Sequence, residues 1–518
     1  MNQSILLTLL TVVPFLGAVL VAAVPTDRSL LARRIALAVT GFAFVLTGAI
    51  WISFDATSGA VQLVHRFEWI PTLHVDYFVG IDGLGLVMIG LTSLVLPMAM
   101  LASRRVTENI PMYYALLLFL QAGLYGTFTA LNFFHWFLFW ELTLIPAFFL
   151  IKFWGGPLRS GAAIQFFVYT MVGSIALLVG FLGLYLATGT FDFIQLAELA
   201  RTGGVQKAIA ARINWPGMDA EQVYSLMAVG VLFGFAVKVP MVPFHSWLPL
   251  TYSQAPTPVT MVLTGVMSKM GVYGLLRLFL PIFPHAIDSF MTILLWLAIA
   301  TVVLSAGAAL VQTDLKRMFA YSSINHLGYC LLGIFAAAHS GGDVAGLVQE
   351  KAAVLNGVVL QMFNHGITAA ALFCFLVYLE DRSGGKTGIG EFGGLRKVAP
   401  VFCGLMGISL FASLGLPGLN GFVGEFLIFK GVFALSAWAA VLALPGLLVT
   451  AVFILTVMQK VFHGPLNAEW KSLPDLTNRE RLIVLPATAL MFVVGLFPGL
   501  LVQIINPTVI RLTEGLRF

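Results

Sequence analysis

Four ionisable residues of this chain stand inside long apolar stretches of sequence: Glu141, Lys238, Lys269 and Glu425. A charge at the centre of a membrane segment costs about 2.5–3.5 kcal/mol on insertion scales, so membrane proteins retain such residues chiefly for function. Carboxylates and amines can each hold and release a proton. The four residues therefore indicate a path for protons, or for another small cation, through a membrane protein.

Glu141 and Lys238 suggest a switch. A carboxylate placed as deeply as Glu141 needs a partner or a proton, and Lys238 is the natural partner. An ion pair favours the charged forms of both groups, whereas removal from water favours the neutral forms. Opening and closing the pair would therefore change how strongly the lysine holds its proton. The alternative is a static ion pair that only supports the structure.

Lys269 and three histidines extend this set. No acidic residue stands near Lys269 in its own segment, and we expect this desolvated lysine to act as a central proton relay. His245, His326 and His365 lie in or beside apolar segments, and an imidazole can pass a proton between its two nitrogens. The alternatives are hydrogen-bonded core histidines, or two histidines that hold a haem between them.

The composition is that of a membrane protein. Of the 518 residues, 59% are hydrophobic and only 10% are charged, and the mean hydropathy is +0.96. A soluble globular chain carries about 25% charged residues. The three cysteines stand far apart in apolar runs, which argues against a cysteine metal motif or a disulfide framework. Despite the net charge of +5, no basic run is long enough to indicate nucleic-acid binding.

The apolar pattern predicts fourteen transmembrane helices, at about 20 residues each. The longest polar stretches, 53–80 and 189–222, are expected to be outside loops. With the N-terminus outside, the inside loops hold 17 lysines and arginines and the outside loops hold 9, as the positive-inside rule requires. Both termini are thus predicted on the outer, periplasmic side. The predicted helices begin near Ser4, Arg34, Ile81, Pro111, Asn132, Ala162, Val223, Gln254, Ile287, Lys316, Ala353, Val398, Ala437 and Arg481.

Two of these helices must be broken. Residues 239–249 contain three prolines directly after Lys238, and proline removes a backbone donor and clashes with the preceding turn. Residues 413–426 combine glycines and a proline with Glu425. Two such breaks far apart in one chain are typical of transporters built from repeated halves, with the site near the bilayer midplane. The alternative is a pair of kinks that serve packing alone.

We therefore predict an all-α polytopic membrane protein with two inverted five-helix repeats, each containing one broken helix. Residues 1–518 are expected to form a single membrane domain. Its approximate parts are N-terminal helices (1–110), a first repeat half (111–280), a second repeat half (287–463) and a last helix (481–504).

Several motifs around these charges carry a family resemblance. They are Phe139-Trp140-Glu141, Ala236-Val-Lys238-Val-Pro-Met-Val-Pro-Phe-His245-Ser-Trp-Leu-Pro249, Ala255-Pro-Thr257, Lys269, Gly271-Val-Tyr-Gly-Leu-Leu-Arg277, Tyr321-Ser-Ser-Ile-Asn-His326-Leu-Gly, Asn364-His365-Gly and Gly415-Leu-Pro-Gly-Leu-Asn-Gly-Phe-Val-Gly-Glu425-Phe. With these motifs the chain resembles the antiporter-like membrane subunits of respiratory complex I, over about residues 75–500. The glutamate at the twelfth-helix break, where sister subunits usually carry lysine, makes it most similar to subunit M of bacterial NADH–quinone oxidoreductase, the mitochondrial chain 4 type.

The resemblance implies a role for each matched position. Glu141 and Lys238 would gate proton uptake, Lys269 would be the central relay, and Glu425 would be the last acceptor before release outside. The three histidines would help water to carry protons along the midplane. No residue is implied in catalysis of the redox reaction or in binding a metal.

The resemblance also implies an assembly. The chain would be a subunit of a proton-translocating NADH:quinone oxidoreductase in the bacterial inner (plasma) membrane, beside sister antiporter-like subunits. It would carry no redox centre, because NADH, FMN, iron–sulfur clusters and quinone belong to partner subunits. The chain departs from the family at Leu250, Gln254 and Gln165, where acidic residues at the first two positions and a lysine at the third are common. We expect these changes to alter the inside uptake path.

Other functions fit part of the pattern. A subunit of a multisubunit cation/proton antiporter would share the fold, and carboxylates beside broken helices also suit sodium. A haem-bearing electron-transfer subunit would use the histidines differently. A purely structural scaffold would tolerate loss of Glu141 or Lys238.

Overall fold

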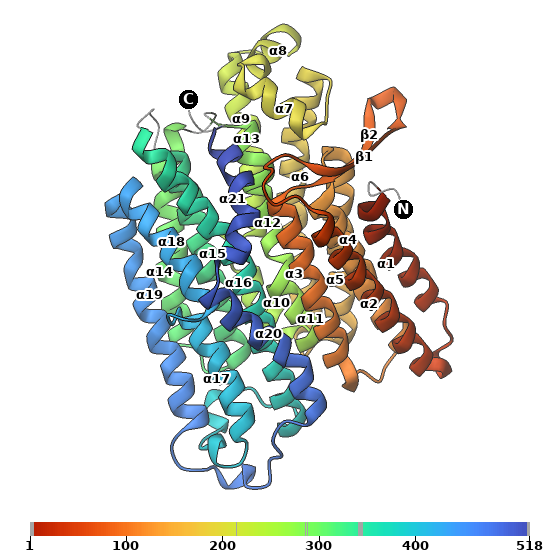
Figure 1. Cartoon of the computed structure of the whole chain (residues 1–518), viewed down its shortest axis with the longest axis vertical. Helices are drawn as coiled ribbons and strands as arrows, with labels where there is room; N and C mark the ends of the chain where they lie inside the picture. The colour runs from red at the N-terminus through yellow and green to blue at the C-terminus, as the bar shows by residue number, and fades with distance from the viewer. Residues whose placement is uncertain (1–4, 214, 285, 287, 340–344, 515–518) are drawn as a thin grey trace.

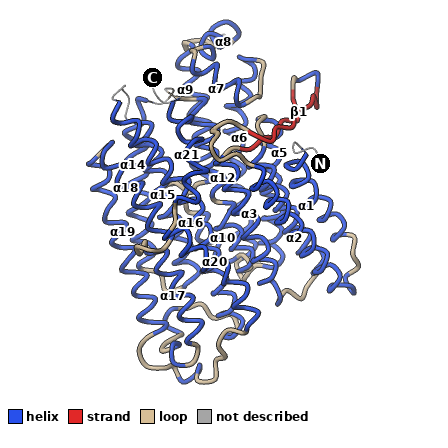
Figure 2. Tube along the Cα trace, viewed as in Figure 1, coloured by secondary structure: helices blue, strands red, loops and turns tan. Residues whose placement is uncertain are grey.

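The computed structural model describes residues 5–213, 215–284, 286, 288–339 and 345–514. Its helices stand side by side in a tall bundle (Figures 1 and 2). The helices are α1 (Leu6–Ala22), α2 (Ser29–Ser53), α3 (Gly83–Ala102), α4 (Ile110–Thr129), α5 (Phe133–Trp154), α6 (Arg159–Thr188), α7 (Phe193–Arg201), α8 (Gly204–Arg212), α9 (Ala220–Lys238), α10 (Trp247–Gln254), α11 (Thr257–Val262), α12 (Lys269–Gly274), α13 (Leu280–Ile282), α14 (Met291–Leu310), α15 (Leu315–His339), α16 (Ala345–Ser383), α17 (Pro400–Leu414), α18 (Asn420–Leu435), α19 (Ala437–Val457), α20 (Asn478–Leu496) and α21 (Gly499–Glu514).

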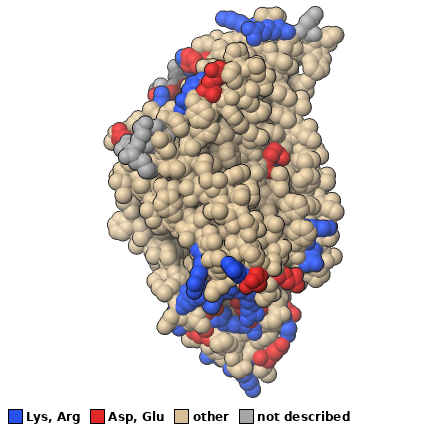
Figure 3. All heavy atoms as spheres, turned by 90° about the vertical axis from the view of Figure 1, so that its right-hand side faces the viewer, with Lys and Arg blue, Asp and Glu red and all other residues tan. Residues whose placement is uncertain are grey.

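The bundle has the dimensions of a multi-pass membrane protein. Among the described residues, nine helical segments are long and apolar enough to cross a membrane, or ten if α20 and α21, bent by 70°, count as one span. Charged side chains gather at the two ends of the face in Figure 3 and are nearly missing from the belt between them. The predicted helical membrane architecture is confirmed, whereas the number fourteen remains a prediction.

One end of the bundle, called the hairpin end below, contains two strands and two short helices. They lie in the polar stretches 53–80 and 189–222, which were expected to be loops. Strands β1 (Gln62–Ile70) and β2 (Val75–Ile81) pair antiparallel, and α7 and α8 lie beside them (Figure 1). Arg66 of β1 contacts both Asp76 of β2 and Asp192 before α7, so one guanidinium ties the hairpin to the helix. α1 begins and α21 ends at this hairpin end.

Two helices are interrupted, as the proline and glycine pattern predicts. α9 and α10 are separated by residues 239–246, and α17 and α18 by residues 415–419. α9 enters the bundle from the hairpin end, whereas α17 enters from the opposite end, called the loop end below (Figure 1). The Trp247 indole N–H donates to the Val237 carbonyl at 3.0 Å, which satisfies a backbone acceptor at the first break.

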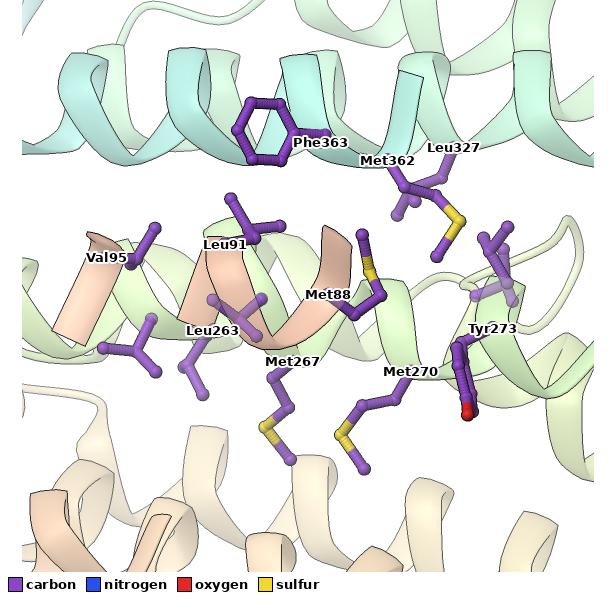
Figure 4. Packing of buried hydrophobic residues seen from close by; sticks show 14 of the residues in the cluster. Met88, Leu91, Val95, Leu263, Met267, Met270, Tyr273, Leu327, Met362 and Phe363 are labelled. Atoms are coloured by element: carbon purple, nitrogen blue, oxygen red, sulfur yellow. The ribbon is translucent and has the colours of Figure 1, made fainter. Parts of the chain in front are cut away.

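A central helix brings these elements together. α11, α12 and α13 form one fully buried helical segment, Thr257–Ile282, which contains π-helical turns at Leu263–Met267 and Leu275–Phe279. Figure 4 shows Met267 and Met270 on this segment, with Met88 of α3 and Met362 of α16 packed near them. Methionine is unbranched and adapts to irregular space, so it suits the uneven surface that a π-helical turn presents.

Candidate functional site

Lys269 stands at the centre of the site. It is fully buried at the start of α12. Its Nζ donates to the Thr264 carbonyl at 2.5 Å and to the Ser268 hydroxyl at 3.3 Å, and it lies 2.7 Å from Nδ1 of His365 on α16. No carboxylate contacts this amine within the part of the chain that the structure describes. Only neutral groups therefore hold the lysine.

The π-helical turn before Lys269 supplies one of these groups. The Ser268 N–H bonds to the Leu263 carbonyl, five residues back. In a regular α-helix that bond would go to Thr264, four residues back. The Thr264 carbonyl instead accepts from the Lys269 amine and from the Ser268 hydroxyl at 3.0 Å. The local irregularity thus provides an acceptor where the amine needs one, as π-bulges often do at functional sites.

Lys238 is the second buried lysine, at the last turn of α9. Its side chain is 4% exposed, and Nζ lies 4.9 Å from the centre of the Trp140 ring. A cation over an indole face is attracted by the ring quadrupole. Lys238 also lines a small cavity together with Tyr252 and Ser268. The cavity has about 10 Å³ for the centre of a water molecule, close to the minimum for one water. It separates Lys238 from the Ser268 hydroxyl that bonds Lys269.

Glu141 does not contact Lys238 directly. It is half-buried on α5, and its Oε1 has no hydrogen-bond partner among the described residues. The residue before Glu141, Trp140, contacts the lysine instead. Its ring faces the Lys238 amine, and its indole N–H donates to the Ser174 hydroxyl at 2.9 Å. The structure therefore brings Glu141 and Lys238 to the same region, and the closed ion pair remains a prediction.

Two adjacent histidines continue the row away from Lys269. The rings of His365 on α16 and His326 on α15 lie 4.9 Å apart, centre to centre, with an angle of 37° between their planes. Nε2 of His326 lies 3.2 Å from the Ser413 hydroxyl at the end of α17. Because Lys269 already occupies Nδ1 of His365 and the two rings are adjacent, a haem has no space between these histidines.

Glu425 ends the row on α18. Its Oε1 lies 3.2 Å from His326 Nδ1, and the carboxylate is 6% exposed. The Gln361 amide nitrogen lies 3.2 Å from the same His326 nitrogen. An unprotonated Nδ1 accepts from Gln361, whereas a protonated Nδ1 donates to Glu425. The protonation state of His326 therefore decides which of the two neighbours it bonds.

The helix break makes room for the Glu425 carboxylate. Gly415 adopts a left-handed conformation, with φ of +79°, at the end of α17. A side chain at this position would overlap Glu425 Oε2. Asn420 at the start of α18 exchanges amide hydrogen bonds with the Asn364 backbone and side chain, at 3.2 and 2.6 Å. These bonds fix the break against α16, one residue from His365.

His245 stands apart from the row. It is half-buried between α9 and α10, and its Nδ1 lacks a hydrogen-bond partner among the described residues. The described contacts join it neither to Lys238 nor to Lys269. The structure therefore gathers Lys238, Lys269, His365, His326 and Glu425 into one buried row, and leaves His245 and Glu141 beside it.

Several members of the site were missed in the sequence. Thr264, Ser268 and Gln361 contact the row but carry no charge, so their types alone did not distinguish them from other polar residues in membrane helices. Gln361 stands one turn before His365, a spacing that could have pointed to it. A buried ion pair was also missed. Lys316, near which a predicted helix begins, is 8% exposed and pairs with Glu380 at 3.2 Å.

The row has the chemistry of a proton path. Two amines, two imidazoles and a carboxylate follow one another along the row, and each can take a proton on one side and release it on the other. The one gap, between Lys238 and Ser268, contains the small cavity described above. Among the described residues no group of three or more His, Cys, Asp or Glu is arranged to hold a metal ion. The geometry therefore supports movement of protons across the middle of the bundle.

Comparison with known proteins agrees with this chemistry. A sequence profile of the family described as "NADH:quinone oxidoreductase/Mrp antiporter, TM" matches residues 130–453, which include Glu141 and Glu425. The chain is 34% identical to the protein named NADH-quinone oxidoreductase subunit M of Rhodobacter capsulatus, over 98% of this chain and 96% of that one.

Two solved structures share the fold. A chain of respiratory complex I from Thermus thermophilus with bound NADH superposes with a TM-score of 0.83 at 24% identity, covering 99% of this chain and 100% of that one. A chain of the Mrp complex from Dietzia sp. DQ12-45-1b gives a TM-score of 0.82 at 21% identity, and the match covers 99% of both. At these identities the likeness establishes the arrangement of the helices. A chain with this arrangement occurs in each of the two complexes.

Proposed function

The chain belongs to the NADH:quinone oxidoreductase/Mrp antiporter membrane family, among relatives named subunit M, and from that premise we propose that it moves protons within an NADH–quinone oxidoreductase. It would act as a membrane-arm subunit whose proton movement is coupled to quinone reduction elsewhere in the complex. The observation that carries the proposal is the buried contact between Lys269 Nζ and His365 Nδ1 at 2.7 Å, which lies in a row leading to Glu425.

Each residue of the site has a proposed role in proton transfer that follows from its position. Glu141 and Lys238 receive the proton and control its uptake, with Trp140 holding the lysine while the pair is open. Lys269 takes the proton across the small cavity and passes it to His365. His326 then delivers it to Glu425. His245, at the first break, orders water near the uptake side.

The architecture of two inverted halves follows from the breaks. The first half, residues 111–280, contains the break after α9, and the second, residues 287–463, contains the break after α17. The chain runs in opposite directions through the two breaks, which is the relation expected of inverted repeats. Fourteen spans result if each broken helix counts once. The hairpin end then faces the outer side, with both termini.

The partners and cofactors follow from the proposed assembly. Sister antiporter-like subunits would flank the chain in the bacterial inner membrane. NADH, FMN, iron–sulfur clusters and quinone would be held by other subunits, and this chain would carry no redox centre. Its part of the reaction is proton transfer alone.

The experiment is a pair of substitutions at the uptake site. Glu141→Gln and Lys238→Met keep side-chain size while removing the charge. In the purified complex reconstituted into vesicles, we expect each to lower proton pumping driven by quinone reduction at least about tenfold, which corresponds to about 1.4 kcal/mol in the barrier. The co-purifying chains should be unchanged, which shows that assembly is intact.

Lys152→Met on the same helix is the matched control. Among the described residues, Lys152 bonds the Ser160 hydroxyl near the loop end and no member of the row, so its loss should leave pumping unchanged. Full pumping in either Glu141→Gln or Lys238→Met would refute the proposed uptake site. If this chain co-purified only with subunits of a cation/proton antiporter, and its proton movement required sodium instead of quinone reduction, the antiporter function would replace the proposal.

A further inference from the structure

An apolar groove of about 600 Å³ runs between α4 and α5. Leu116 and Phe119 of α4 line one side of it, and Ile145 and Phe153 of α5 line the other. Ile145 and Phe153 are 51% and 52% exposed, so the groove is open to the surroundings of the bundle. Such an open apolar groove on a membrane protein needs an apolar occupant.

The groove is as long as one leaflet of a bilayer is deep. It begins at Asn109, just before α4, and reaches Phe119 ten residues later, which is about 15 Å along a helix axis. The hydrocarbon core of a bilayer is about 30 Å thick, so this length is half of it. Because α4 begins toward the loop end, the groove lies in the leaflet at that end.

A smaller cavity of about 360 Å³, called the rim cavity below, adjoins the groove at its loop end. The groove and the rim cavity share Glu108, Phe153 and Trp154 as lining residues. The Trp154 indole N–H donates to the Glu108 carbonyl at 2.8 Å, and the Arg159 guanidinium donates to the Phe153 carbonyl at 3.0 Å. Glu108 and Arg159 are thus both held at the end of α5, where the apolar groove meets the rim cavity.

Five charged side chains line the rim cavity, and three of them already have a partner of opposite charge. Arg105 pairs with Asp381 at 2.9 Å, and Glu380 pairs with a lysine of α15 at 3.2 Å. The other two, Glu108 and Arg159, are exposed, and no ion pair among the described residues includes either of them. The rim cavity therefore offers one guanidinium and one carboxylate to an occupant.

We propose that the groove and the rim cavity bind one molecule of phosphatidylethanolamine. One acyl chain lies in the apolar groove, and the phosphate contacts the Arg159 guanidinium, whose planar fork of N–H donors matches phosphate oxygens. The primary ammonium of the head group donates to the Glu108 carboxylate. The head group thus has one charge of each sign, as the rim cavity does.

Other occupants fit the same surface less well. An anionic phospholipid lacks a cation for Glu108 and brings a further negative charge toward it. Phosphatidylcholine has a cation, but its quaternary ammonium has no N–H to donate. A helix of a partner subunit is about 10 Å wide with its side chains, whereas a flexible acyl chain can follow a groove of 600 Å³ closely.

The site lies close to the proposed uptake carboxylate. The groove is also lined by Leu142, the residue after Glu141, so the acyl chain packs against the turn of α5 that carries this glutamate. Binding of the lipid does not depend on the proposed proton movement, and it is measured without it.

Photo-crosslinking in the purified complex tests the site. The complex is placed in vesicles that contain a limiting amount of phosphatidylethanolamine with a diazirine on one acyl chain, and mass spectrometry locates the labelled residues. We expect labels on α4 and α5 between Met112 and Phe153, and loss of these labels when unlabelled phosphatidylethanolamine is added in excess. Equal competition by phosphatidylglycerol or by phosphatidylcholine would overturn the assignment of the head group. A lack of label on both helices, as expected if a partner subunit covers the groove, would overturn the site.

Three variants separate the head-group contacts from the groove. Glu108→Gln and Arg159→Gln each remove one exposed charge, and we expect each to weaken labelling about threefold, the size of one exposed charge contact. Ile145→Trp fills the groove and should abolish labelling. Unchanged labelling in Ile145→Trp, or in both charge variants, would contradict the proposal.

Arg317→Gln is the matched control for the charge variants. Arg317 is an exposed arginine at the start of α15, and it lines neither the groove nor the rim cavity. Its labelling should equal that of the unmodified complex. A loss as large as that in Arg159→Gln would show that general surface charge recruits the lipid, which would also contradict the proposed site. The co-purifying chains of each variant show whether the complex is assembled.

Discussion

At the residue scale, Lys269 is held only by neutral groups. Its amine contacts a carbonyl, a hydroxyl and an imidazole, and none of these locks the charged form as a carboxylate would. A buried lysine tightly paired with an acid would hold its proton firmly and stop the relay. The proposed relay role of Lys269 therefore depends on the absence of a contacting carboxylate among the described residues.

The substitution Lys269→Met tests the proposed relay role of this lysine. Methionine has nearly the same length and removes the amine, so we expect proton pumping to fall by at least about tenfold. Stability should change little, because the lost hydrogen bonds, at about 0.5–1.5 kcal/mol each, are offset by removal of a buried polar group. Pumping in vesicles and the thermal midpoint of the purified complex measure the two effects.

The neighbouring Met270→Leu is the control for Lys269→Met. Such volume-conserving swaps usually cost less than about 1.5 kcal/mol, and Met270 carries no proton, so pumping should continue. A Lys269→Met complex that pumps at the normal rate would remove this residue from the path.

The sequence predicted the charged residues of the site and missed their neutral partners. Glu425 and Lys269 were recognisable because a charge is costly in an apolar segment. Ser268 and Thr264 were not, because serine and threonine commonly bond the carbonyl of their own helix, as Ser268 does here. The contact between the His326 and His365 rings depends on how α15 packs against α16, and a single sequence does not contain that relation.

At the element scale, the second break positions Glu425 through one glycine. Gly415 needs its left-handed backbone to end α17, and its missing side chain leaves space for the carboxylate. The prolines and glycines predicted where both helices break. The π-helical turn before Lys269 left no comparable sign, because Leu263–Met267 contains no proline and its single glycine, Gly265, does not by itself mark a bulge.

Gly415→Ala is predicted to impair function more than stability. Alanine in a left-handed conformation costs about 1–2 kcal/mol, and its methyl group would also displace Glu425. Gly418→Ala is a matched control in the same break. Its φ of +93° imposes similar strain, but the nearest atom to the added methyl group is Leu496 Cδ2 at 4.0 Å.

We therefore expect both glycine variants to lower the thermal midpoint of the complex by a similar amount, and only Gly415→Ala to lower proton pumping severely. Equal pumping in the two variants would show that the position of the Glu425 carboxylate does not depend on this contact.

At the scale of the whole molecule, the proposed path has a predicted direction. The excess of basic residues predicts that the loop end faces the inside. The row runs from Lys238 at the first break to Glu425 at the second. Hydropathy predicted the membrane segments from the sequence. It did not predict the hairpin or α7, because these lie in polar stretches whose folded structure depends on long-range contacts such as the one between Arg66 and Asp192.

Cysteine labelling checks the predicted direction. Ala210 on α8 is exposed at the hairpin end, and Lys397 is exposed in a loop at the opposite end. A membrane-impermeant maleimide should label Ala210→Cys and not Lys397→Cys in right-side-out vesicles, and the pattern should reverse in inverted vesicles. The buried native cysteines leave the signal to the introduced thiol. The opposite pattern would place the hairpin end on the inside, and the proposed direction of proton movement from Lys238 to Glu425 would have to be reversed.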